Sequence, residues 1–68
     1  MNELFIKFLQ MVDNAMLRER MQDNAQAIIF WKNALWCIDE LNEGESLFIG
    51  KEMAEQINMR VELLSIFL

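Results

Sequence analysis

The fold is decided by residues 27–41, AIIFWKNALWCIDEL. Apolar residues recur in this stretch at intervals of four and three, and polar residues gather on the opposite side of a helical projection. That spacing predicts an amphipathic α-helix, because an α-helix turns once every 3.6 residues. Its expected core seam is Ala27, Trp31, Ala34, Ile38 and Leu41, flanked by Phe30, Leu35 and Cys37. Ile29 and Trp36 fall within the polar sector and have no place in that seam.

The rest of the chain also favours helices. Pro is absent, the two Gly residues lie at positions 44 and 50, and good helix formers dominate elsewhere. We therefore expect a single all-α domain over residues 1–68, with three helices built on a helical hairpin. The expected helices cover about 2–22, 24–41 and 51–67, with a turn at 42–50.

Local signals refine these boundaries. Asp23 followed three residues later by Gln26 matches a capping box, which predicts a helix start near Asp23. Because no Gly or Pro lies nearby, the first two helices could also form one bent rod. The apolar residues 47–49 are expected to form a short plug for the core.

The first and third helices carry apolar stripes of their own. The expected core stripe of the first helix is Leu4, Phe5, Phe8, Leu9, Met11, Val12, Ala15 and Met16. That of the third helix is Met53, Ala54, Ile57, Val61, Leu64 and Leu68. A second stripe on the other side of the third helix consists of Met59, Leu63 and Ile66.

The composition excludes several classes of function. The chain has 68 residues, 11 acidic and six basic side chains, a net charge of −5, no His and one Cys. The usual general base and the commonest zinc ligand are therefore missing, and Cys37 can form neither an internal disulfide nor a Cys-rich metal site. A buried Cys37 is expected, and a reactive thiol is the alternative. The charge disfavours nucleic acid and anionic membranes. We expect a cytoplasmic protein that is not an enzyme and has no cofactor, metal or small-molecule ligand.

The chain is more apolar than its length requires. Apolar residues make up 54% of it, yet a domain this short buries only about 60% of the surface of its unfolded chain. We therefore expect a homodimer that shares an apolar core, with candidate interface residues Ile29, Trp36, Met59, Leu63 and Ile66. Three alternatives stay open: packing within one chain covers these residues, they mediate self-association, or they bind a different protein. The acidic residues concentrated between 39 and 55 fit either a solvated loop or an acidic lip that favours a basic partner.

Residues 24–34 resemble a motif of the AraC negative regulators, which are small anti-activators of Gram-negative pathogens. The matching positions are Ala27-Ile28, Phe30-Trp31 and Ala34, and a second block can be laid on Ala54, Arg60 and the apolar tail. Asn24 stands where the family has Tyr, and the family's C-terminal Cys is not present. The resemblance implies a dimeric helical regulator of virulence that inhibits a transcription activator of the AraC type by direct protein contact.

Two other classes of protein fit the same composition. A type III secretion chaperone or co-chaperone would hold an apolar helix of an export substrate in a groove. An antitoxin or phage-encoded inhibitor would neutralise a basic partner. All three classes need a compact helical scaffold with an apolar face, so the residues alone do not choose among them.

Overall fold

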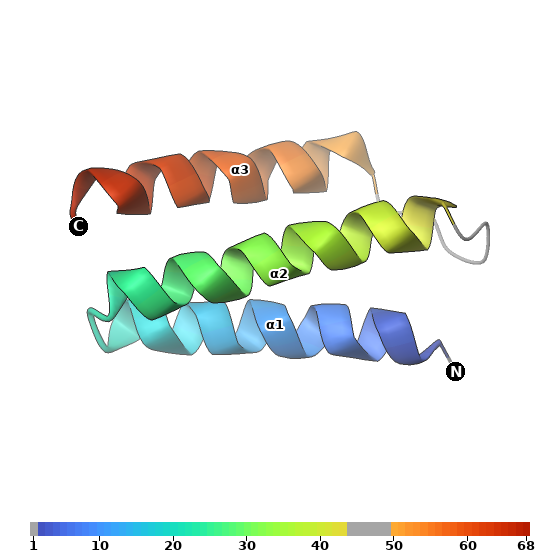
Figure 1. Cartoon of the computed structure of the whole chain (residues 1–68), viewed down its shortest axis with the longest axis horizontal. Helices are drawn as coiled ribbons and strands as arrows, with labels where there is room; N and C mark the ends of the chain where they lie inside the picture. Colours follow the sequence, from blue (N-terminus) through green and yellow to red (C-terminus); the bar gives the residue numbers. More distant parts are fainter. Residues whose placement is uncertain (1, 44–49) are drawn as a thin grey trace.

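The computed structural model describes residues 2–43 and 50–68. In these residues it contains the helices α1 (Glu3–Arg20), α2 (Asn24–Glu43) and α3 (Lys51–Ile66), which confirms the predicted all-α class. Successive helices run antiparallel, and α2 lies between the other two (Figure 1). The two chain ends lie at opposite ends of the molecule.

The turn between α1 and α2 closes without Gly or Pro. The N–H of Asp23 donates to the carbonyl of Arg18 at 2.9 Å, and that of Gln22 donates to the carbonyl of Glu19 at 2.9 Å. These two bonds form a Schellman motif, which needs a left-handed residue after the helix. Gln22 takes that conformation, with φ of 61°. The first two helices are therefore separate and do not form one bent rod.

Side-chain caps start α1 and α2. The Asn2 side chain accepts hydrogen bonds from the N–H groups of Leu4 and Phe5, at 2.9 and 3.3 Å. The Asp23 carboxylate accepts from the N–H of Gln26 at 3.3 Å, which is the accepting half of the predicted capping box. Because α2 continues to Glu43, the predicted turn does not begin at residue 42. The predicted plug at 47–49 lies outside the described residues.

The buried half of α2 is the centre of the core. All five residues of its predicted seam are buried, together with Ile28 and Cys37. Alanines 15, 27 and 34 are fully buried, and small side chains of this kind let two helices approach closely. From the other helices, the buried residues are Phe8 and Ala15 of α1 and Ile57 and Leu64 of α3.

The three helices do not close into a bundle. Within the described part of the chain, no Cα atom of α3 lies within 8 Å of one in α1, whereas both helices pack on α2. Four residues expected in the core are exposed: Leu9, Met16, Met53 and Leu68. The prediction was wrong for these residues, and for Met16 and Met53 the reason is that they border the space between α1 and α3, which do not pack against each other.

The left-handed residue in the first turn gives a test of this fold. We expect Gln22→Gly to raise the free energy of unfolding by about 0.5–1 kcal/mol, since glycine adopts positive φ without the strain of a side chain. The measurement is urea denaturation followed by circular dichroism.

The matched control is Gln10→Gly, the same exchange at an exposed position inside α1. It should lower the free energy of unfolding by about 0.5–1 kcal/mol, because glycine weakens a helix interior. Destabilisation by both exchanges would contradict the turn described above.

Candidate protein-interaction surfaces

The five residues predicted to form an interface are all exposed. The exposed fractions are 49% for Ile29, 51% for Trp36, 67% for Met59, 49% for Leu63 and 74% for Ile66. Packing within one chain therefore does not cover them. Their role as an interface stays a prediction, with self-association and binding of another protein as its two forms.

Ile29 and Trp36 form a ridge on the exposed side of α2. The indole ring of Trp36 is held by Lys7 of α1, whose Nζ lies 5.3 Å from the ring centroid. This cation–π contact places the ring beside α1 and still leaves half of the side chain exposed. The Ile29–Trp36 ridge is thus an exposed apolar surface with one contact to α1.

The stripe of Met59, Leu63 and Ile66 lies on α3, away from α2. These three residues line a shallow hollow together with Gln56, Arg60 and Glu62, and no residue of α2 contributes to it. The structure therefore places the five predicted residues on two separate surfaces, the Ile29–Trp36 ridge and the α3 stripe.

A third apolar surface, which the sequence did not reveal, lies between α1 and α3. Here a hollow of about 280 Å³ is lined by residues of all three helices: Val12, Met16, Trp31, Met53, Gln56, Ile57 and Arg60. We call it the α1–α3 hollow. Met16 and Met53 are exposed in it because their helices do not meet. The signal was present in the sequence as the unusually wide apolar arcs of the first and third helices.

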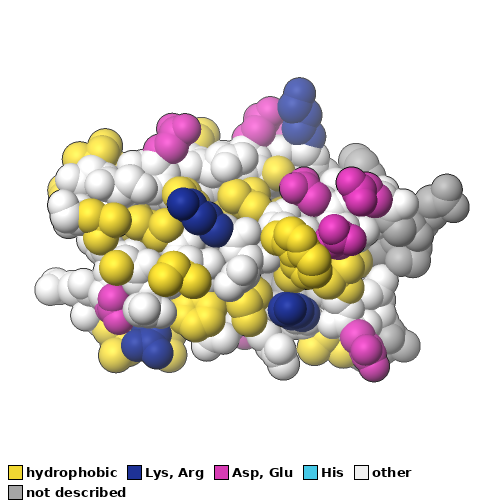
Figure 2. All heavy atoms as spheres, in the orientation of Figure 1, with side chains coloured by type: hydrophobic (Ala, Val, Ile, Leu, Met, Phe, Trp, Pro, Cys, Tyr) yellow, Lys and Arg dark blue, Asp and Glu magenta, His cyan; other side chains and the backbone are white. Residues whose placement is uncertain are grey.

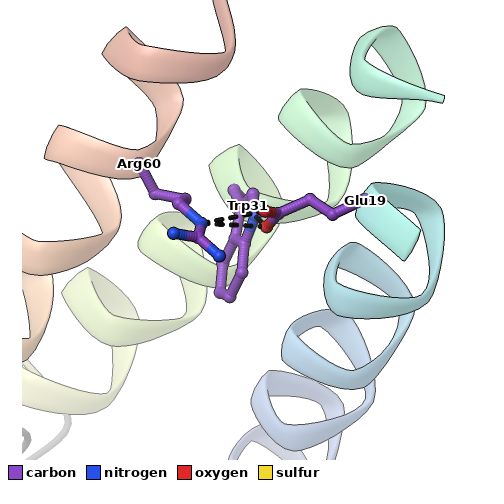
Figure 3. A network of polar contacts seen from close by, with 3 residues as sticks. All are labelled: Glu19, Trp31 and Arg60. Atoms are coloured by element: carbon purple, nitrogen blue, oxygen red, sulfur yellow. Dashed lines mark hydrogen bonds and ion pairs between the residues drawn. The ribbon is translucent and has the colours of Figure 1, made fainter. Parts of the chain in front are cut away.

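A polar cluster joins the three helices at one end of this hollow. The Nε1–H group of Trp31 donates to Glu19 Oε2 at 2.7 Å, and the Nε–H group of Arg60 lies 2.9 Å from Glu19 Oε1 and 3.2 Å from Oε2 (Figure 3). The Glu19 side chain is only 16% exposed, whereas that of Arg60 is 52% exposed. Glu19 therefore satisfies the buried indole N–H and at the same time ties α1 to α3.

Cys37 is a buried core residue, as expected. Burial raises the pKa of its thiol above the usual value, and the nearby Lys7 opposes that rise. In the part of the chain that is described, no group of three or more potential ligand side chains could hold a metal ion. No helix among those residues is both long and apolar enough to cross a bilayer.

Comparisons of the chain with protein-family models, with curated proteins and with solved structures give no match. The resemblance to the AraC negative regulators therefore stays a prediction from the residues. What the structure adds is the location of the exposed apolar surfaces.

The Glu19 cluster yields a prediction about stability. We expect Glu19→Ala to lower the free energy of unfolding by about 1–2 kcal/mol, because the buried indole N–H of Trp31 loses its acceptor. The half-exposed Arg60 adds little to this figure, since solvent screens its ion pair. Urea denaturation measures the change.

Two further variants are compared with Glu19→Ala in the same denaturation experiment. Glu19→Gln keeps an acceptor for the indole and should cost about half as much. Glu40→Ala removes an exposed carboxylate of α2 and should be neutral within about 0.5 kcal/mol. Equal effects of Glu19→Ala and Glu40→Ala would contradict a structural role for the cluster.

The buried thiol gives a prediction about reactivity. At pH 8 we expect a thiol reagent to modify Cys37 in the folded protein at least about a hundredfold more slowly than in urea, since the group must first become exposed. The reaction is followed by the absorbance change of a colorimetric thiol reagent. The chain has no other cysteine, so this change reports the modification of Cys37 alone. Equal rates in the two conditions would show an accessible, reactive thiol.

Proposed function

We propose that this chain is a small regulator that inhibits a transcription activator of the AraC type by direct protein contact. The Ile29–Trp36 ridge is the proposed contact surface. The observation that carries the proposal is a tryptophan, Trp36, that is half exposed on the outer side of α2 with Lys7 Nζ 5.3 Å from its ring centroid.

The chemistry of the ridge is that of a binding hot spot. Tryptophan is enriched among the few residues that dominate binding energy, because its large ring loses little conformational entropy when it is buried. Lys7 already contacts the ring in the free protein, and a contact of this kind favours one orientation of the ring.

The charge around the ridge favours a basic partner. Asp39, Glu40 and Glu43 are exposed on α2 after Trp36. Figure 2 shows acidic side chains gathered toward the end of the molecule where α2 ends and α3 begins. A DNA-binding activator must carry Lys and Arg to neutralise phosphates, so it offers a complementary surface. The chain itself, with a net charge of −5, is unsuited to compete for the DNA.

The choice of an AraC-type activator rests on the resemblance of Ala27–Ala34 to the AraC negative regulators. Part of that motif is structural in this chain, since Ala27, Trp31 and Ala34 are buried. The resemblance thus supports the scaffold, and the exposed ridge beside it supplies the proposed contact.

The test is a reporter driven by each AraC-type activator of the native host, with this chain expressed beside it. We expect expression to fall with one activator, and that activator to co-purify with the chain. Trp36→Glu should restore expression and weaken the complex by about 30-fold or more, the loss typical of a hot-spot residue.

The matched control is Leu17→Glu, which places the same charge at an exposed apolar position of α1. It should leave both repression and the complex unchanged. The proposal fails if no activator responds, or if Trp36→Glu acts no differently from Leu17→Glu. A secreted substrate co-purifying in place of an activator would favour the chaperone alternative instead.

A further inference from the structure

We propose that the chain forms a two-fold homodimer in which the α3 stripe of each copy packs into the α1–α3 hollow of the other. The inference concerns the association of this chain with itself and does not depend on the function proposed above. It rests on the shape of the hollow, on the exposed side of α3 and on the charges that border both.

The hollow has the form of a site for one more helix. Helices α1 and α3 both pack on α2 without meeting, and Trp31 lies buried between them. Exposed methionines line the two flanks, Met16 on α1 and Met53 on α3. A helix with an apolar side placed there would cover both flanks, as a fourth helix does in a bundle.

The chain itself carries such a helix. Met59, Leu63 and Ile66 give α3 an exposed apolar side, and no residue of α1 or α2 lines the hollow beside it. The hollow beside this stripe and the α1–α3 hollow share Gln56 and Arg60, so one surface continues around α3 from one to the other. A two-fold axis makes the two insertions equivalent. Each copy then covers the α3 stripe and the α1–α3 hollow of the other.

The charges beside the two surfaces are complementary. Glu62 borders the α3 stripe. Arg20 borders the end of the α1–α3 hollow, next to Met16 and the Glu19–Arg60 pair. Among the described residues no ion pair is found for Arg20 or Glu62, so each is available to pair with the other across the interface.

The other exposed apolar surface is a poor choice for self-association. Asp39 and Glu40 are exposed on α2 just after Trp36, so two copies that meet at the Ile29–Trp36 ridge would gather negative charge beside the interface, which opposes the contact. The residues that line the α1–α3 hollow include no carboxylate, and Glu19, which lies at its end, is paired with Arg60. A chain with a net charge of −5 can therefore meet its own copy there with the least repulsion.

The first experiment measures the mass of the purified chain by sedimentation equilibrium over a range of concentrations. We expect a monomer–dimer equilibrium, and Leu63→Glu should weaken the dimer by about 30-fold or more. The matched control is Ile29→Glu, because Ile29 and Leu63 are both 49% exposed. It should leave the dimer constant unchanged. A monomeric wild-type chain at high micromolar concentration, or equal effects of the two variants, would overturn the proposal.

The second experiment tests which surfaces meet. Glu62→Arg and Arg20→Glu should each weaken the dimer by about fivefold, since each places like charges opposite one another. The double variant restores an opposite-charge pair and should return to within about twofold of the wild type. Circular dichroism checks that all variants fold. If the double variant is as weak as the single ones or weaker, the stripe does not pack beside Arg20 and the arrangement is wrong.

Discussion

The buried half of α2 holds the three described helices together, because α1 and α3 each pack on α2 and not on each other. Ile38 and Leu41, two of its largest buried side chains, are almost completely inaccessible, and burying each contributes about 1.5–3 kcal/mol. A closed three-helix bundle would have three helix pairs, whereas here there are two. Met16 and Met53, which face the space between α1 and α3, are therefore left at the surface.

The polar cluster around Glu19 also results from the packing of α1 and α3 on α2 and not on each other. Trp31 lies between α1 and α3, and its indole N–H needs an acceptor there because the residue is buried. Glu19 reaches it from α1, and Arg60 of α3 then balances the half-buried carboxylate. An apolar interface between α1 and α3 would join the two helices along their length. The Glu19 cluster joins them at one level only, through polar contacts.

The sequence predicted what depends on local periodicity and missed what depends on the relative position of helices. The α2 seam and the Asp23 cap are local patterns, and both were found. Glu19 and Arg60 are 41 residues apart, and nothing in the sequence pairs them. The left-handed Gln22 was also unpredictable, because glycine or asparagine is the usual residue there.

The candidate interface was predictable in part, for a related reason. Ile29, Trp36 and the α3 stripe fall outside any core seam on a helical projection, so periodicity named them as candidates, and the packing of the helices shows that they are exposed. Met16 and Met53 lie within such seams, and their exposure depends on an angle between helices that periodicity does not determine. Residues at the edge of a wide apolar arc are therefore ambiguous until the packing is known.

The two candidate interfaces lie on different sides of α2, and this separation has a consequence for binding. Trp31 and Trp36 are on the same helix, yet one lies at the α1–α3 hollow and the other on the exposed side. A dimer formed through the hollow would leave both Ile29–Trp36 ridges open, one on each copy. Activators that act as dimers could then engage both ridges at once, and the second contact would form at the high effective concentration set by the first. Modest affinity at each ridge would then be sufficient for tight overall binding.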